Sequence, residues 1–297
     1  MDQSEAKHVE AAGATLLVWC QGMGPPLLLL HGFPQTSLMW RYLAERLAHR
    51  FTVVCADLRG YGGSSCPLSA PDHSPYSKRA MAADLVTVMD RLGFSRWSVV
   101  GHDRGGRVAY RLALDHPDRI SRLAVLDVVP TESAWERADA RFALGFWPWA
   151  LLAQPAPLPE SILAVAADAI LDSALGSWGT PAATFTPEVR AAYLDALRDP
   201  AHAHAICEEY RAAAAVDRKH DRADRANGRR IACPLFVIWS ARGPLADWYG
   251  EEGPLAIWRE WASDVQGCAI DAGHFFPEEA PDNTFHILTR FLDEATP

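Results

Sequence analysis

The residues that could do chemistry centre on Asp103. An apolar run through Val99 and Val100 leads into residues 101–105, which read Gly-His-Asp-Arg-Gly. This spacing is typical of a sharp strand-to-helix turn that exposes a nucleophile, where a Cβ at either glycine would clash. A carboxylate nucleophile forms an ester with an alkyl carbon, so the pattern favours reaction at an alkyl centre. Similar short motifs occur in turns that bind nothing, so the assignment depends on partner residues.

His274 is the strongest candidate for a general base. It follows the last predicted strand and lies next to Gly273, where a parallel sheet collects functional residues at the carboxyl ends of its strands. A solvated loop histidine is the alternative. Asp127, which ends the strand after the turn, is the expected orienting acid. Asp247 is a second candidate, whereas Asp271 is expected to be structural because it shares a short segment with His274.

Backbone and side-chain donors near Asp103 complete the predicted site. The N–H of Arg104 and that of Phe33, on the loop after an early strand, would form an oxyanion hole. The side chains of Arg104 and Arg107 suggest a substrate with a carboxylate, which guanidinium groups bind in a bidentate manner. The alternative is that both arginines pair with protein carboxylates such as Asp57 or Asp127.

Strand and helix patterns alternate through the first 127 residues and predict a parallel sheet with right-handed crossovers. Strands are expected at 15–20, 27–30, 51–56, 97–100, 123–126, 234–239 and 265–270, and helices at 37–49, 77–92, 107–116, 255–262 and 281–292. Residues 131–226 lack strand patterns and predict an inserted helical cap. The expected domains are therefore a core of 1–130 with 227–297 and a cap of 131–226.

Composition limits the classes of function. The chain has 297 residues with 28 Lys and Arg against 37 Asp and Glu, and a formal net charge of −9 argues against nucleic-acid binding. The polar N-terminus does not resemble a signal peptide, and the apolar stretch 142–153 is too short to span a membrane. Six cysteines without a C-x-x-C pair predict mostly buried free thiols. We expect a cytoplasmic protein that needs no metal or organic cofactor.

Four longer stretches carry a resemblance. HGFPQT at 31–36, ADLRGYGGSS at 56–65, GHDRGGR at 101–107 and LDHPDR at 114–119 resemble the fluoroacetate (haloacetate) dehalogenases of the α/β-hydrolase superfamily, and QPAP at 154–157 and GHFF at 273–276 extend the likeness. The string at 103–107 is the more specific, since HGFP and GYGGSS are shared with epoxide hydrolases. The resemblance implies an α/β-hydrolase fold, with a mostly parallel sheet, helices on both faces and an inserted cap. It also implies Asp103 as nucleophile, Asp127 with His274 as the hydrolytic pair, and Arg104 with Arg107 as the carboxylate clamp.

The family's halide site is matched in part. The resemblance implies a His, a Trp and a Tyr in the cap that bind the leaving halide, and Trp149 and Tyr210 match the Trp and the Tyr. Packing within the cap is the alternative role for both. The position of the His holds Pro148, which has no side-chain donor. Because fluoride is the poorest leaving group, we expect chloro- or bromoacetate to be better substrates than fluoroacetate.

The predicted function is hydrolysis of a haloacetate to glycolate and halide through an Asp103 ester. An epoxide hydrolase would share this machinery but needs two cap donors, for which Tyr210 and Tyr193 are candidates. A third possibility is another α/β-hydrolase, or a non-catalytic homologue that binds an acidic ligand. The expected partner is a small anionic molecule, and the resemblance alone implies a homodimer.

Overall fold

One sheet organises the protein. A computed structural model describes residues 6–249 and 253–293. Within these ranges eight strands pair in the order β1-β2-β4-β3-β5-β6-β7-β8, with β1 and β2 antiparallel to their neighbours and the others parallel. The strands are β1 (Lys7–Glu10), β2 (Thr15–Gln21), β3 (Pro26–Leu30), β4 (Thr52–Ala56), β5 (Trp97–His102), β6 (Ile120–Leu126), β7 (Leu235–Ser240) and β8 (Val265–Ile270). The four leucines of β3 are fully buried, as expected for a central strand covered on both faces.

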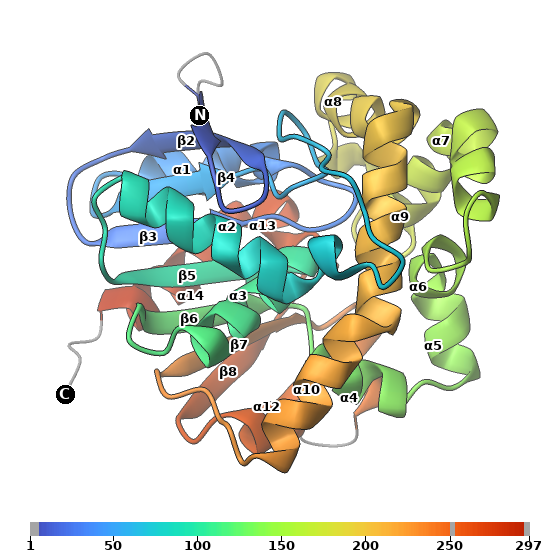
Figure 1. The fold of residues 1–297 in the computed structure, drawn as a ribbon. Helices are drawn as coiled ribbons and strands as arrows, with labels where there is room; N and C mark the ends of the chain where they lie inside the picture. The colour runs from blue at the N-terminus through green and yellow to red at the C-terminus, as the bar shows by residue number, and fades with distance from the viewer. Residues whose placement is uncertain (1–5, 250–252, 294–297) are drawn as a thin grey trace.

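Helices cover both faces of the sheet (Figure 1). On one face α2, α3 and α12 pack into one core cluster, and on the other α1 and α14 pack into a second. Outside residues 131–226, the described helices are η2 (Ser37–Trp40), α1 (Arg41–Leu47), η3 (Ser74–Tyr76), α2 (Lys78–Arg91), α3 (Arg104–Asp115), α11 (Leu245–Trp248), α12 (Pro254–Trp261), α13 (Phe276–Glu279) and α14 (Pro281–Asp293). This arrangement confirms the predicted fold class.

Local sequence explains where these elements start and stop. The Ser77 side chain accepts a hydrogen bond from the N–H of Ala80 and caps α2, and Gly93 follows that helix with φ of +85°. Some predicted boundaries were wrong. The helix expected over 37–49 is divided into η2 and α1, and α3 begins at Arg104 rather than at Arg107. The predictions also missed β1, α11 and α13, which are each only four residues long.

Between β6 and β7 the described elements are all helical, as the sequence predicts. We call them the inserted helices: α4 (Thr131–Glu136), α5 (Ala140–Gly145), α6 (Trp147–Leu152), α7 (Leu158–Gly176), η4 (Ala182–Thr184), α8 (Pro187–Arg198), α9 (Pro200–Ala214) and α10 (Val216–Ala226). Figure 1 shows them gathered beside one end of the sheet. Helix α9 lies among α6, α7, α8 and α10 and also contacts η3 of the first half of the chain. It therefore links the inserted helices to the loops that follow the strands.

The described parts of the chain contain no helix with the length and apolar character needed to cross a bilayer. All six cysteines are free thiols. The expectation that most are buried was wrong: Cys55, Cys207 and Cys233 are buried, whereas Cys20 is exposed and the other two are partly exposed.

Candidate active site

Asp103 occupies a strained turn between β5 and α3. Its backbone has φ of 46° and ψ of −115°, a conformation that side chains with a Cβ rarely adopt. The two flanking glycines permit the turn, because a Cβ on Gly101 or on Gly105 would lie 2.4 Å from a backbone carbonyl oxygen. The predicted turn is therefore present, and the strain fixes the direction in which the Asp103 carboxylate projects.

One oxygen of Asp103 is held and the other is free. The backbone N–H of Phe33 donates to Asp103 Oδ1 at 2.9 Å, whereas Oδ2 accepts no hydrogen bond from any described residue. This approach needs Gly32, since a Cβ there would lie 2.4 Å from Asp103 Cβ. The N–H of Arg104 is at the first position of α3, where no acceptor within the helix exists. Phe33 and Arg104 thus offer the two backbone donors that the sequence predicts.

His274 and Asp127 meet as an oriented pair. His274 Nδ1 lies 2.6 Å from Asp127 Oδ2, so Nδ1 carries the proton and Nε2 is left for another partner. The other oxygen of Asp127 accepts the N–H of Ser240 at 2.9 Å. The two alternative acids are elsewhere: Asp247 is exposed, and the Asp271 side chain is 91% exposed and pairs with a surface arginine.

Further contacts hold His274 in place. Its backbone N–H donates to the carbonyl oxygen of Trp178, one of the residues within the insertion, and the Trp178 ring packs edge-on against the imidazole at 5.1 Å. Its carbonyl oxygen lies 2.9 Å from His102 Nε2. Burial lowers the pKa of His102 to about 3, so His102 is neutral and acts as a structural donor.

The two arginines beside Asp103 are buried and incompletely hydrogen-bonded. Arg104 donates from Nε to Glu209 Oε1 at 2.7 Å and from Nη2 to the Glu209 carbonyl oxygen at 3.3 Å, while its Nη1 is buried without a partner. Arg107 donates from Nη1 to the Val129 carbonyl oxygen at 2.6 Å, and its Nε is buried without a partner. Neither pairs with Asp57 or Asp127. Each therefore keeps donor capacity for a ligand.

Two aromatic rings from the inserted helices cover these guanidinium groups. The Tyr210 ring centroid lies 4.1 Å from Arg104 Cζ, and the Trp149 ring centroid lies 4.3 Å from Arg107 Cζ. Tyr210 also packs edge-on against Phe33. The four residues chosen from the sequence as clamp and halide site thus come together around Asp103. Pro148, in the first turn of α6, brings no side-chain donor.

Charge and burial adjust the ionisable groups. Burial raises the pKa of Asp103, but electrostatic interaction with His274 and with the Arg104 guanidinium outweighs it and holds that pKa below its usual value. Asp103 is therefore an anion at neutral pH. Burial also raises the pKa of Tyr210 well above the ordinary value for tyrosine, so its hydroxyl keeps the proton and can donate. No group of three metal-ligating side chains occurs among the described residues.

Tyr193, the second candidate donor for an epoxide, is engaged elsewhere. Its hydroxyl donates to Glu278 Oε1 at 3.0 Å in a buried cluster that also holds Gln35 and Arg41. The hydroxyl of Tyr210 has no partner among the described residues. The inserted helices therefore contribute one uncommitted tyrosine, Tyr210, to the surroundings of Asp103.

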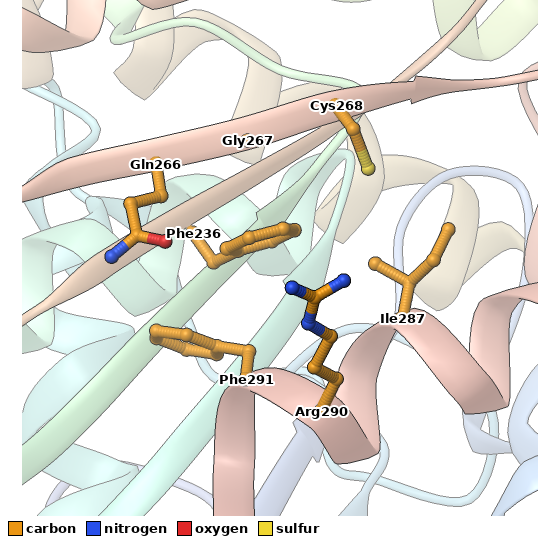
Figure 2. Close-up of a pocket in the computed structure, with 7 residues that line it drawn as sticks. All are labelled: Phe236, Gln266, Gly267, Cys268, Ile287, Arg290 and Phe291. Carbon is orange, nitrogen blue, oxygen red and sulfur yellow. The ribbon is translucent and has the colours of Figure 1, made fainter. Parts of the chain in front are cut away.

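Another cavity, of about 280 Å³, lies between strands β7 and β8 and helix α14 and is separate from this site (Figure 2). Figure 2 shows Phe236, Cys268, Ile287, Arg290 and Phe291 around it. None of the candidate site residues lines it.

Sequence reasoning missed two residues of the site, Glu209 and Trp178. Glu209 directly precedes Tyr210 in the chain, but a single glutamate in a helix is usually on a solvated face. Trp178 is in an irregular segment between α7 and η4, with no pattern that would bring it to His274. Both contacts join residues far apart in sequence.

Comparison with known proteins agrees with this architecture. The profile of the α/β hydrolase fold family matches residues 25–281. A fluoroacetate dehalogenase from Burkholderia sp is 43% identical over 292 residues, which cover 98% of this chain and 94% of the relative. The chain is an α/β-hydrolase of the haloacetate dehalogenase type. It thus belongs to the hydrolases that act on carbon–halide bonds.

Other proteins are also similar to this dehalogenase-type hydrolase over nearly its whole length. A soluble epoxide hydrolase from Corynebacterium sp. (strain C12) is 29% identical over 91% of both chains. A solved structure from Nostoc sp PCC 7120, described as an α/β hydrolase, superposes with a TM-score of 0.94 at 45% identity and covers 98% of both chains. The Corynebacterium epoxide hydrolase is less similar to this chain than the Burkholderia dehalogenase is, over a similar part of the chain.

Proposed function

We propose that this hydrolase converts a short 2-haloacid, such as chloroacetate, to the 2-hydroxy acid and halide through an ester on Asp103. One observation carries the proposal. One carboxylate oxygen of Asp103 accepts a hydrogen bond from a backbone N–H, and the other has no hydrogen-bond partner among the described residues. Beside it lie two buried guanidinium groups with unpartnered N–H donors. A nucleophile for an alkyl carbon is thus adjacent to a binding site for a carboxylate, and a 2-haloacid carries these two groups on neighbouring carbons.

The first step is a displacement. The substrate carboxylate binds Arg104 Nη1 and Arg107 Nε, which brings the 2-carbon to Asp103 Oδ2. This oxygen attacks the carbon, the carbon–halogen bond breaks, and the halide leaves with the bonding electrons. The ester carbonyl oxygen is Oδ1, which the Phe33 N–H already holds. The inserted helices act as a cap that excludes water from this step.

The second step hydrolyses the ester. His274 Nε2 takes a proton from water, and the resulting hydroxide attacks Asp103 Cγ. The tetrahedral oxyanion is stabilised by the N–H groups of Phe33 and Arg104, and Asp127 stabilises the imidazolium. The intermediate collapses and the hydroxy acid leaves with the proton from His274. Asp103 is left as a carboxylic acid with one oxygen from water, and it releases the second proton of that water to regenerate the carboxylate. The sum is haloacid plus water to hydroxy acid, halide and a proton.

The leaving halide is expected to contact Trp149 and Tyr210. Both rings lie against the arginines that bind the substrate, and the Tyr210 hydroxyl is a protonated donor without a partner among the described residues. Because Pro148 supplies no donor, the site has fewer hydrogen bonds for fluoride than the family pattern implies. We therefore expect chloride and bromide to leave faster than fluoride.

Epoxide hydrolysis is the second candidate, and the likeness to epoxide hydrolases favours it. An epoxide oxygen would need two donors as it opens. Tyr210 is available, but the Tyr193 hydroxyl donates to Glu278. An epoxide also has no carboxylate for the two arginines. Both observations support a haloacid over an epoxide.

The trapping experiment uses His274→Ala, which should form the ester but fail to hydrolyse it. We expect steady-state chloride release to fall at least about a hundredfold. Mass spectrometry of the peptide that contains Asp103 should show a carboxymethyl ester after incubation with chloroacetate. Asp271→Ala, which removes an exposed carboxylate from the same segment, should behave as wild type. Absence of both adduct and halide release with every haloacid tested contradicts the proposal, and an adduct from an epoxide instead supports the alternative.

The role of residue 148 is tested separately with Pro148→His. An imidazole N–H beside the leaving group should raise the rate of fluoride release relative to chloride release by about tenfold, the effect of roughly one hydrogen bond. Pro148→Ala, which restores no donor, is the matched control. An unchanged ratio of fluoride to chloride release in Pro148→His would show that this position does not select the halide.

A further inference from the structure

Glu209 is a fully buried carboxylate that connects α9 to three elements of the sheet half of the protein. It accepts hydrogen bonds from Arg104 Nε at 2.7 Å, from the Tyr61 hydroxyl at 2.8 Å and from Lys78 Nζ. Arg104 begins α3, Lys78 begins α2, and Tyr61 is in the loop after β4. All four side chains are almost completely buried. A buried carboxylate with this many donors is held rigidly.

The contacts of Glu209 decide how the Arg104 guanidinium is turned. The Glu209 carboxylate accepts a hydrogen bond from Arg104 Nε and lies 2.7 Å from Arg104 Nη2. The backbone carbonyl oxygen of Glu209 also accepts a hydrogen bond from Nη2. Two of the three guanidinium nitrogens are thereby used, and the third, Nη1, is left buried without a partner. A planar guanidinium fixed at two nitrogens has no rotational freedom left. The direction of Nη1 therefore follows from Glu209.

Two cations, Arg104 and Lys78, share the carboxylate of Glu209. Burial raises the pKa of Glu209, but Arg104 and Lys78 outweigh it and hold that pKa at about 2. Burial and the charge of Arg104 lower the pKa of Lys78. A second carboxylate, Asp217, lies 3.6 Å from Lys78 Nζ and does not reach Arg104. Because Arg104 Nη1 is buried without a partner, the Arg104 side of the cluster is suited to a further carboxylate.

We propose that Glu209 is a positioning residue for the substrate carboxylate, which it directs onto Arg104 Nη1 by holding the rest of that guanidinium. This inference rests on the proposed function, in which Arg104 binds the carboxylate. Glu209 itself touches neither the substrate nor Asp103. Because Tyr210 follows it in α9 and stacks on Arg104 at 4.1 Å, the same anchor also sets the distance between the carboxylate site and the donor for the halide.

The test compares Glu209→Gln with Asp217→Asn. Each removes the charge of a buried carboxylate beside Lys78, but only Glu209 contacts Arg104. Binding is measured by calorimetry with acetate, which has the carboxylate but no leaving group. We expect Glu209→Gln to weaken acetate binding at least about tenfold and to raise KM for chloroacetate by a similar factor, with kcat changed less than about threefold. Asp217→Asn should leave the acetate affinity and KM as in wild type.

Each result has one reading. Unchanged acetate affinity in Glu209→Gln, or equal weakening in both variants, overturns the positioning role. If acetate binding depends on Glu209 but the wild-type enzyme releases no halide, the positioning role stands and the proposed function is contradicted. Wild type that binds no acetate overturns both. If Glu209→Gln does not fold, Glu209→Asp keeps the charge but shortens the reach by one methylene, and an unchanged acetate affinity in that variant overturns the role equally.

Discussion

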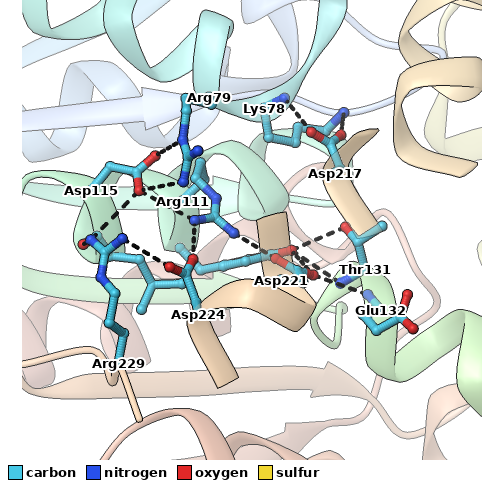
Figure 3. Close-up of polar contacts among 12 residues, drawn as sticks. Lys78, Arg79, Arg111, Asp115, Thr131, Glu132, Asp217, Asp221, Asp224 and Arg229 are labelled. Atoms are coloured by element: carbon cyan, nitrogen blue, oxygen red, sulfur yellow. Dashed lines mark hydrogen bonds and ion pairs between the residues drawn. The ribbon is translucent and has the colours of Figure 1, made fainter. Parts of the chain in front are cut away.

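Two buried ion clusters join the inserted helices to α3, and the charged group at their centre has opposite sign. In the first, Glu209 of α9 meets two cations, Arg104 and Lys78. In the second, Arg111 of α3 meets three carboxylates, Asp221 and Asp224 of α10 and Asp115 at the end of its own helix (Figure 3). The first cluster adjoins Asp103, whereas the second lies at the other end of α3.

The second cluster is also complete in its hydrogen bonds. Asp221 accepts from Arg111, from the Tyr110 hydroxyl at 2.9 Å and from the N–H of Glu132 at 3.0 Å, and surface arginines pair with the remaining carboxylates. No polar side-chain atom of Arg111, Asp221 or Tyr110 is buried without a partner. In the first cluster Arg104 Nη1 has none. Similar residue types and similar burial therefore serve two purposes, since one cluster attaches α10 to α3 and the other retains a donor for a ligand.

The largest expected effect comes from exchanging the central arginine of each cluster for methionine. Arg104→Met should lower kcat/KM for chloroacetate by about a hundredfold to a thousandfold, because a buried charge-assisted contact to the substrate is lost. Arg111→Met should leave kcat/KM within about threefold but destabilise the fold by about 3–5 kcal/mol, because it leaves the buried Asp221 without its cation and removes one of the cations of Asp115 and Asp224. Chloride release and thermal melts of both variants measure this. Equal losses of activity would mean that the clusters do not differ in function.

A pair of tyrosines extends the comparison to two hydroxyl donors of the inserted helices. Tyr210→Phe should lower kcat for chloroacetate by about tenfold to a hundredfold, since its free hydroxyl is the proposed donor to the leaving halide. Tyr193→Phe should lower stability by about 1–2 kcal/mol through loss of its bond to Glu278, with kcat unchanged. Rapid-quench measurement of halide release separates the two effects. A larger kinetic defect in Tyr193→Phe would revive the epoxide hydrolase alternative.

The sheet side of the site could be predicted because local rules determine it. The strand that ends at Asp127, the strand before His274 and the glycine-flanked turn at Asp103 are each recognisable in short windows. A parallel sheet then brings the carboxyl ends of its strands to one edge. The 2.6 Å contact between His274 and Asp127 follows from this, although 147 residues separate them.

The side of the site made by the inserted helices could be predicted only in part. Trp149 and Tyr210 came from a family resemblance, and their packing on the arginines is a result of how α6 and α9 cross. Glu209 gave no signal, because a helix shows in sequence which residues share a face but not what that face meets. The missed strand β1 has a similar cause: its four residues are mostly polar and exposed, so no apolar alternation marks it.

The smallest expected effect is on the pH dependence of stability, and it should have opposite sign in the two clusters. Burial raises the pKa of Asp221 to about 6 in the folded protein, whereas the same carboxyl in the unfolded chain titrates near pH 4. Between these two values the folded protein keeps a proton on Asp221 that the unfolded chain has released. Its contribution to stability is therefore present below pH 4 and is lost as pH rises through 6. Glu209, with its pKa held at about 2, contributes stability above its usual range near pH 4.5 that is lost as pH falls toward 2. Of these two carboxylates, only Asp221 should titrate between pH 5 and 7.5.

Thermal melts of wild type and Asp221→Asn at pH 5 and pH 7.5 measure this difference. The stability of wild type relative to Asp221→Asn should be higher at pH 5 by about 1 kcal/mol, or a few degrees in Tm, because Asp221 is protonated only at the lower pH. The same comparison with Glu209→Gln should show no change over that interval. A pH-independent difference for Asp221→Asn would mean that Arg111 keeps Asp221 ionised throughout, and that the two clusters are alike in their electrostatics despite their unequal numbers of carboxylates.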